Sequence, residues 1–269
     1  MNSFGSVMKE IRKDRKMTQK MLSQDICSQS VLSRIENDEE LPNVMVMQQL
    51  CQRLGVSMDQ VLTFNSERVQ KINELMETFA FYFRHKEYHA LYRSLDHVED
   101  ILYLESDLQR YYYYRGSCQY YLFRDNERAL QDLRHALDLS YHRNKPFITD
   151  WEIQIMSCMG KVFMSLGNQE KARRFLEESI HQFYTLPSER IHVELAKIFY
   201  NYASFLIQNH EPLRALEQVD QGISWLRQKN SYYFLPELFR LKAKLMNDPE
   251  ESRKYEKFAE YLEWIHTVN

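Results

Sequence analysis

The feature that most constrains this chain is a spacing of four and then three between small or apolar residues, which recurs along its C-terminal three quarters. The triplets are Leu91-Leu95-Val98, Ala129-Leu133-Ala136, Ala172-Leu176-Ser179 and Ala215-Val219-Gly222, with a weaker copy at Tyr255-Ala259-Leu262. The first four begin at residues 91, 129, 172 and 215, which are 38, 43 and 43 residues apart. Residues three and four apart share one face of a helix. Each triplet therefore predicts a helix, and their recurrence predicts stacked units.

The clearest copy lies between Gly160 and Ser179, where glycine, an aromatic residue, glycine, alanine and leucine occur at the spacings of a tetratricopeptide hairpin. The chain resembles such repeats, although its periods exceed the usual ~34 residues and so predict lengthened helices. Small residues at these positions allow neighbouring helices to approach closely. We expect five hairpins, at roughly 66–99, 104–141, 147–186, 187–229 and 231–268.

The composition agrees with an almost wholly helical protein. The 269 residues include only 6 Gly and 6 Pro, and 44% of them are hydrophobic, which is ample for a core. We therefore predict an all-α fold with two domains. A small domain covers residues 1–65, and a right-handed α-solenoid of tetratricopeptide-like hairpins covers residues 66–269.

The small domain contains a stretch, residues 17–37, that predicts two short helices joined by a tight turn. Thr18 and Ser28 are placed to cap the first and the second helix through their hydroxyl groups. The side chains predicted to face inward are Met21, Leu22 and Ile26 in the first helix and Leu32 and Ile35 in the second. After Pro42, a further helix with Leu50 and Leu54 on its inner face is expected to end at Gly55.

The opposite side of the second helix is a row of polar side chains: Gln29, Ser30, Ser33, Arg34 and Asn37. Such a row can exchange hydrogen bonds with base edges in the major groove of DNA. This arrangement is typical of a helix-turn-helix. On these residues alone, an ordinary amphipathic hairpin with a solvated outer face remains the alternative.

Residues 8–62 resemble the five-helix repressor-type (Cro/C1, or XRE) domain in the order of an arginine, Thr-Gln, a leucine, a serine, a glutamate, a proline and the final LGVS. The turn Ile26-Cys27-Ser28-Gln29-Ser30 is one residue shorter than usual. Followed by SRIE, it resembles the Rgg/PlcR-type peptide-responsive regulators of the RRNPP family. The resemblance implies a DNA-binding transcription regulator of the quorum-sensing type, which a short signalling peptide controls. It also implies that Arg12 and Glu36 form a structural ion pair.

On this basis we expect two groups of DNA contacts on an inverted repeat in double-stranded DNA. Base edges should be read by Gln29, Ser30, Ser33 and Arg34, and phosphates should be met by Thr18, Gln19, Lys20 and Ser28. The net charge of −3 does not favour a nucleic-acid binder. However, residues 9–20 hold six Lys or Arg and only two acidic residues, and such a strip can meet phosphates locally.

The first helix of each stacked hairpin lines the concave side of a solenoid, where extended peptides bind. Alignment of these helices predicts a peptide site made of Tyr111, Tyr114, Tyr121, Gln154, Lys161, Lys197, Tyr200, Asn201, Arg240 and Lys244. Tyrosine and arginine dominate binding hot spots, and amides can bond a peptide backbone. Some of the tyrosines must instead belong to the core. By resemblance, Asn201 occupies a peptide-binding position. We expect a peptide carboxylate to pair with Lys161, Lys197, Arg240 or Lys244.

The last predicted helix is unusually apolar for the end of a solenoid, with Phe258, Leu262, Trp264 and Ile265. We expect a homodimer contact there, with simple capping of the stack as the alternative. Two rival functions also stay open. One is an XRE-family repressor whose repeats only oligomerise, and the other is an interaction protein whose repeats bind a cellular protein.

Several classes of protein are not supported by the sequence. The four cysteines form neither a CxxC pair nor a disulfide framework, which suits a reducing cytoplasm. His85 and His89 do not have a zinc-binding arrangement, and we expect no metal or cofactor. We find no signal peptide, no membrane span and no catalytic motif. We therefore expect a cytoplasmic protein that is not an enzyme.

Overall fold

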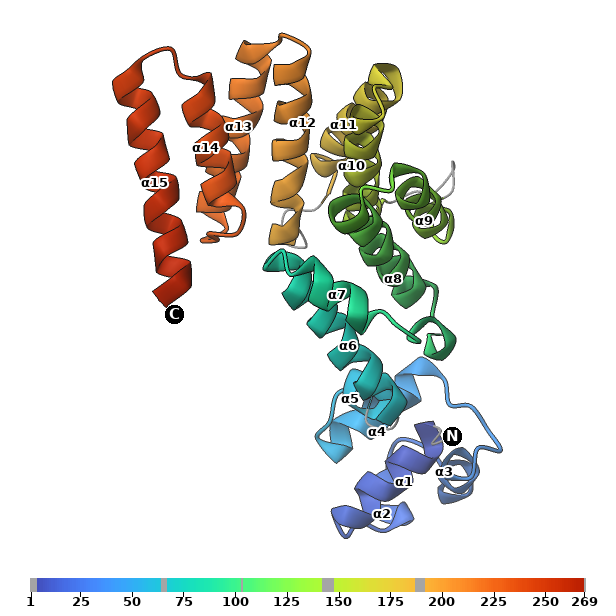
Figure 1. Cartoon of the computed structure of the whole chain (residues 1–269). Coiled ribbons are helices and arrows are strands. Elements are labelled where there is room, and N and C mark those ends of the chain that lie inside the picture. Colours follow the sequence, from blue (N-terminus) through green and yellow to red (C-terminus); the bar gives the residue numbers. More distant parts are fainter. Residues whose placement is uncertain (1–3, 64–66, 103, 142–147, 187–191, 269) are drawn as a thin grey trace. The chain divides into compact units, whose positions relative to one another are not determined.

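The computed structural model describes residues 4–63, 67–102, 104–141, 148–186 and 192–268 (Figure 1). Within these ranges all regular elements are helices, which confirms the prediction of an all-α fold. Two compact units are present, Met1–Leu75 and Met76–Asn269. Their boundary falls inside helix α6 (Glu67–Arg84), ten residues after the domain boundary expected from the sequence.

The first unit contains five short helices around one core. They are α1 (Phe4–Asp14), α2 (Gln19–Ser23), α3 (Gln29–Glu36), α4 (Val44–Leu54) and α5 (Met58–Thr63). Buried apolar residues from all five meet in this core: Val7, Met8, Ile11, Leu22, Leu32, Ile35, Leu50, Cys51, Leu54 and Val61.

Side-chain caps define the ends of the helix-turn-helix. The hydroxyl of Thr18 accepts a 3.1 Å hydrogen bond from the amide of Met21, and the hydroxyl of Ser28 accepts a 3.2 Å bond from the amide of Val31. Gly55 closes α4 with a left-handed φ of 63°, which glycine adopts without strain. These three expectations are confirmed.

The inner stripe predicted for the first helix is partly wrong. Helix α2 ends at Ser23, so Ile26 lies beyond it, although it still packs against the core. Met21 is 52% exposed. A helix of five residues has too few turns to bury three positions of one stripe, and Leu22 and Ser23 are the residues that α2 buries.

Helix α1 lies directly against the end of α3. A Cβ atom on Gly5 would be only 1.8 Å from the carbonyl oxygen of Ile35, so this approach requires glycine. The contact places α3 at a fixed position in its unit, with its polar side outward.

The second unit contains helices arranged mainly as hairpins. Helices α8 (Glu105–Cys118), α10 (Asp150–Ser165), α12 (Ala196–Gln208) and α14 (Leu235–Leu245) pack on α9 (Asn126–Asp138), α11 (Gln169–Phe183), α13 (Pro212–Gln228) and α15 (Pro249–Val268), respectively. They follow α6 and α7 (Tyr88–Ser94), and a π-helical turn, Gln119–Phe123, extends α8. Consecutive first helices contact one another, so α8, α10, α12 and α14 form one continuous layer.

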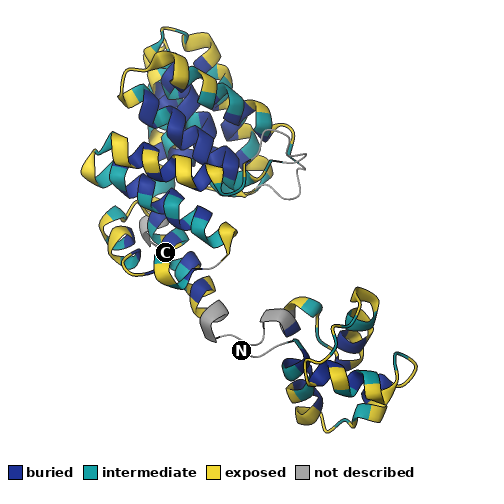
Figure 2. Ribbon diagram, turned by 90° about the vertical axis from the view of Figure 1, so that its right-hand side faces the viewer, coloured by how far each residue is buried: buried dark blue, intermediate teal, exposed yellow. Residues whose placement is uncertain are grey.

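The first four spaced triplets of the sequence form packing faces of these helices, and Figure 2 shows the buried parts of the ribbon in dark blue. Ala129, Ala172 and Ala215 are completely buried, and so is Leu176. Leu176 packs against Gly160 so tightly that an added Cβ would be 2.6 Å from its Cγ. The recurring small residues therefore permit close helix packing, as expected. In the described ranges, no helix is both long enough and apolar enough to span a membrane.

Candidate functional site

Helix α3 presents a polar surface to solvent. Gln29, Ser30 and Arg34 are exposed and Ser33 is half-buried, while Leu32 and Ile35 point into the core. Thr18, Lys20 and Ser28 are also exposed at the starts of α2 and α3, and the hydroxyls of Ser28 and Ser30 are 2.9 Å apart. The expected base-reading residues thus lie on α3, and the expected phosphate-contacting residues lie at the starts of α2 and α3.

A buried ion pair connects the end of α3 to α1. Arg12 donates from Nε and Nη2 to the two carboxylate oxygens of Glu36, at 2.6 and 2.8 Å, and from Nη1 to the carbonyl of Met17 at 2.8 Å. This confirms the structural role expected for Arg12 and Glu36. Burial opposes ionisation of Glu36, but hydrogen bonds from Arg12 and Gln19 outweigh it, so the pKa of Glu36 is lowered.

Two of the expected DNA-contacting side chains form hydrogen bonds with acidic side chains of the protein. Gln19 donates to Glu36 at 2.9 Å, which makes it part of the buried cluster. Arg34 donates from Nε to Glu40 at 2.7 Å in an exposed ion pair. Exposed pairs of this kind contribute only about 0–1 kcal/mol, so other anions can compete for Arg34.

In the second unit, the first helices enclose a small cavity of about 10 Å³. Its lining includes four residues that the sequence predicted for peptide binding, namely Tyr121, Gln154, Lys197 and Asn201. The remaining lining residues are Phe83, Tyr113, Ser157, Cys158 and Ile198. Residues from α6, α8, the π-helical turn, α10 and α12 therefore meet at one point of the inner layer.

Lys161 extends this group of residues. Its ammonium donates to the hydroxyl of Tyr121 at 3.1 Å and lies 5.8 Å from the ring centroid of Tyr200. Tyr121 in turn stacks on Tyr88 at 4.6 Å. Six of the ten predicted peptide-binding residues are thus joined in one cluster: Tyr121, Gln154, Lys161, Lys197, Tyr200 and Asn201.

Lys197 is the most unusual member of this cluster. It is 9% exposed, and its Nζ lies 3.5 Å from the ring centroid of Phe83 and has no hydrogen-bond partner. Burial, with a contribution from the charge of Lys161, lowers the pKa of Lys197 to about 7. Beside it, Asn201 donates to the hydroxyl of Ser157 at 3.0 Å.

The other four predicted residues lie outside the cavity. Tyr114 is a core residue, packed edge-on against Phe83 at 5.4 Å, because the run of tyrosines in α8 places rings on both sides of that helix. Tyr111 is buried beside Arg115. Arg240 forms a two-bond ion pair with Glu263, and Lys244 is exposed on α14. The structure does not bring these four side chains into the cluster.

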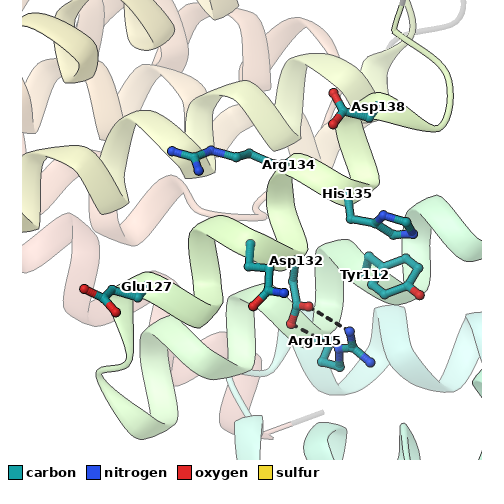
Figure 3. A pocket seen from close by; sticks show the side chains of 8 residues that line it. Tyr112, Arg115, Glu127, Asp132, Arg134, His135 and Asp138 are labelled. Carbon is teal, nitrogen blue, oxygen red and sulfur yellow. Dashed lines mark hydrogen bonds and ion pairs between the residues drawn. The ribbon is translucent and has the colours of Figure 1, made fainter.

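A larger hollow of about 410 Å³ lies between α8 and α9 (Figure 3). It is polar, but its arginine Arg115 is already paired with acidic side chains of the protein. Arg115 donates to both oxygens of Asp132, at 3.0 and 2.8 Å, and to Glu99 at 3.0 Å. Two acids therefore already pair with Arg115, the half-buried arginine among the described lining residues. We assign no ligand to this hollow.

Sequence reasoning missed several residues around the cavity. Ser157 and Cys158 lie between Gln154 and Lys161 on one face of α10, so helical spacing could have identified them. The ring centroids of Tyr233 and Phe234 lie 5.7 and 5.4 Å from the Lys197 ammonium. However, both residues precede α14 in a connection without periodicity. Phe234 has a left-handed φ of 62°, which is uncommon for an aromatic residue. No spacing rule predicts that geometry.

Comparison with known proteins agrees with this architecture. Residues 8–61 match the helix-turn-helix family HTH_3. The curated proteins include no match to the chain. Within the described residues, no group of three or more His, Cys, Asp or Glu side chains could hold a metal ion.

Three solved structures illustrate the similarity in fold. PlcR of Bacillus thuringiensis, in complex with the peptide PapR7 and DNA, has a TM-score of 0.81 at 21% identity, covering 99% of this chain and 96% of that one. ComR of S. thermophilus, in complex with DNA and its signalling peptide ComS, has a TM-score of 0.66 at 18% identity, covering 98% and 94%. The SHP pheromone receptor Rgg2 of Streptococcus dysgalactiae has a TM-score of 0.56 at 11% identity, covering 99% and 95%.

The similarity to PlcR and ComR extends over nearly the whole of both chains, not only over the N-terminal domain. The similarity in fold expected from the sequence is therefore confirmed: residues 8–61 match the helix-turn-helix family HTH_3, and the chain as a whole has a fold similar to those of PlcR, ComR and Rgg2.

Proposed function

We propose that this protein is a cytoplasmic transcription regulator that binds double-stranded DNA through α3 and is controlled by a short signalling peptide bound to its repeat unit. The observation that carries the proposal is the presence, in one chain, of an exposed polar α3 and a cavity in the inner helical layer lined by an unpaired lysine and two amides. The fold shared with PlcR and ComR, both solved with DNA and a peptide, supports it.

The two sets of residues at the helix-turn-helix have different expected roles. Gln29, Ser30, Ser33 and Arg34 read base edges, and Thr18, Gln19, Lys20 and Ser28 contact phosphates. Base contacts confer sequence specificity, whereas phosphate contacts position the protein and make binding sensitive to salt. Gln19 also donates a hydrogen bond to Glu36. Its contribution to DNA binding therefore combines support of the Arg12–Glu36 pair with a phosphate contact.

Substitution of Arg34 and Lys20 tests this division. Arg34→Ala should cost about 1–3 kcal/mol on the selected DNA and relax the sequence preference. Lys20→Ala should weaken binding to all sequences alike and reduce the salt dependence. The measurement is a binding titration at fixed salt on a duplex selected from a random library, beside a scrambled duplex. Equal losses on both duplexes for both variants would contradict the division.

The peptide is proposed to bind across the cluster of Tyr121, Gln154, Lys161, Lys197, Tyr200 and Asn201. Tyrosine rings provide contact area, and the amides of Gln154 and Asn201 can bond an extended backbone. The deciding experiment measures DNA binding with and without synthetic peptides encoded by short reading frames next to the gene. A change in DNA affinity that Asn201→Ala removes supports the proposal. Unchanged DNA binding with every such peptide contradicts it.

We further propose that the protein is a homodimer and that α15 forms part of the contact. Trp264 is 62% exposed, and it shares the helix with exposed Phe258, Tyr261 and Ile265. A dimer matches half-sites about 34 Å, or a multiple of it, apart on an inverted repeat. Sedimentation equilibrium should give twice the chain mass for the protein and a lower association constant for Trp264→Lys. A monomer at micromolar concentration would argue against the dimer.

A further inference from the structure

The ammonium of Lys197 has an unmet need for a hydrogen-bond acceptor. The rings of Phe83, Tyr233 and Phe234 surround it and attract a cation through their faces. Rings do not replace the three hydrogen bonds that an ammonium donates in water. A buried charge without a partner is costly, so this arrangement gains free energy when an anion reaches Lys197.

The surroundings of Lys197 are positively charged. The titratable groups that face it are Lys86, Tyr113, Tyr121, Cys158, Lys161, Tyr233 and Glu237, and burial raises the pKa of the Tyr113 hydroxyl. Glu237 is the acid among them, and it pairs with Lys86. Burial raises the pKa of the Cys158 thiol and of the Tyr121 and Tyr233 hydroxyls, so these groups are neutral near pH 7. In the described ranges, neither Lys161 nor Lys197 has a carboxylate within ion-pair distance.

The size of the cavity limits what can reach Lys197. A volume of about 10 Å³ accommodates a group about the size of one water molecule. A peptide lying on the inner layer can therefore insert little more than one oxygen atom of a terminal group, which is enough to accept a hydrogen bond from the ammonium. Peptides carry negative charge as carboxylates, either at the C-terminus or on Asp and Glu, and a carboxylate accepts hydrogen bonds at both oxygens.

We propose that this cavity is a carboxylate subsite of the peptide site, in which the Lys197 ammonium, with Lys161 beside it, forms an ion pair with one carboxylate of the bound peptide. The proposal rests on the proposed peptide-sensing function and assigns the charge of the ligand and its anchoring residue. It also separates the four cations expected from the sequence, because Arg240 is already paired with Glu263 and Lys244 lies outside the cavity.

A consequence is that peptide binding takes up a proton. The pKa of Lys197 is about 7 in the free protein because of burial and the nearby charge of Lys161. A bound carboxylate favours the charged amine and raises this pKa. Above pH 7, binding therefore draws about one proton from solution, and affinity falls as the pH rises. Below pH 7, Lys197 is already charged and contributes little pH dependence.

The experiment uses the full-length protein and three pools of synthetic heptapeptides. The first pool lacks Asp and Glu and has a free C-terminus, the second is the same pool amidated, and the third is amidated but carries one Glu at varied positions. Affinity capture followed by mass spectrometry is compared for the wild type, Lys197→Met and Lys161→Met. Lys171→Met is the matched control, since Lys171 is an exposed lysine on α11, in the same hairpin as Lys161.

The wild type and Lys171→Met should capture the first or the third pool, which identifies the C-terminus or a Glu side chain as the source of the carboxylate. Lys197→Met should bind the captured peptides at least tenfold more weakly, and Lys161→Met should bind them more weakly as well. The affinity of the wild type should fall about tenfold or more from pH 6.5 to pH 8.5, while Lys197→Met stays flat. Intact tryptophan fluorescence and circular dichroism of Lys197→Met verify that it is folded.

Two results overturn the subsite while leaving the sensing function intact. One is equal capture of the second pool, which has no carboxylate, by the wild type. The other is unchanged affinity of the captured peptides for Lys197→Met. If the wild type captures none of the three pools, the proposed function itself fails, and the subsite fails with it.

Discussion

The two units of this protein each bury a cation to the same extent and treat it in opposite ways. Arg12 is 8% exposed and Lys197 is 9% exposed. Arg12 has three hydrogen bonds, two of them to the carboxylate of Glu36, and the pKa of Arg12 is raised. Lys197 has no hydrogen-bond partner, and its pKa is lowered to about 7. Burial alone therefore does not indicate what a charged residue does.

This difference in pairing distinguishes Arg12, a structural charge, from Lys197, which we propose binds a ligand. In the first unit, the guanidinium fork and the carboxylate satisfy each other, so the pair connects α1 to the end of α3 and needs no further partner. In the second unit, the ammonium lies at a cavity whose lining of rings, amides and hydroxyls includes no carboxylate among the described residues. A protein retains such a costly arrangement most readily where a bound molecule supplies the missing charge.

The largest expected effect comes from breaking the paired cation. Arg12→Met leaves the Glu36 carboxylate buried without its main partner, which should cost about 3–5 kcal/mol of stability in the first unit. The first unit contains no tryptophan or tyrosine, so fluorescence does not report on it. Hydrogen exchange of the amides in α1 and α3, measured by mass spectrometry, should show much faster exchange in this variant.

Lys13→Met is the control for Arg12→Met, because Lys13 is exposed on the same helix. Its amides should exchange as in the wild type. Equal protection in Arg12→Met and Lys13→Met would mean that the Arg12–Glu36 pair does not hold α3 in place. Arg12 would then have no structural role to contrast with Lys197.

The unpaired cation should show the opposite effect on stability. Because the folded-state pKa of Lys197 is lowered from 10.5 to about 7, the unfolded chain binds more protons between these values. The wild type should therefore gain stability from this group as the pH rises from 7 toward 10.5, by at most about 1.4 kcal/mol per pH unit. Lys197→Met should lack this contribution and be the more stable protein at pH 6.5.

All three tryptophans, Trp151, Trp225 and Trp264, belong to the second unit, so urea unfolding followed by tryptophan fluorescence measures its stability. The quantity of interest is the difference between wild type and Lys197→Met at several pH values, which cancels other titrating groups. A difference that does not change with pH would show that Lys197 has an ordinary pKa in the folded protein.

The smallest effect is expected at the exposed ion pair of the first unit. Glu40→Gln removes the carboxylate that engages Arg34 and thereby frees the guanidinium for DNA. DNA affinity should rise a few-fold at low salt, in keeping with about 0–1 kcal/mol for an exposed pair. Glu39→Gln, which removes one neighbouring exposed acid, corrects for the general change in charge. Equal gains from both variants would mean that Arg34 is not held by Glu40.

Helix periodicity predicted the fold well because it depends on local spacing. The caps at Thr18 and Ser28, the end of α4 at Gly55 and the buried small residues Ala129 and Ala172 all follow from rules that span a few residues. Met21 was misplaced because the length of α2, rather than its pattern, decides which positions are buried.

The candidate peptide site was predicted less completely. Helix alignment identified Lys161, Lys197 and Asn201, since each lies on the inner face of a first helix. The same alignment could not separate Tyr114, a core residue, from Tyr121, a cavity residue. Tyr121 lies seven residues after Tyr114, within the π-helical turn Gln119–Phe123. Because a π-helical turn departs from the spacing of an α-helix, it changes the face on which a ring lies.

By itself, the sequence determined that this chain is helical, that a helix-turn-helix precedes repeated hairpins and, for most helices, which face is buried, because hydrophobic spacing and capping act within a few turns. Only the tertiary structure decided which charges find partners. Arg12 meets Glu36 across 24 positions, whereas Lys197 is surrounded by rings from α6 and from the connection before α14. The physical reason is that desolvation and ion pairing depend on distances between residues far apart in the chain, which no local pattern encodes.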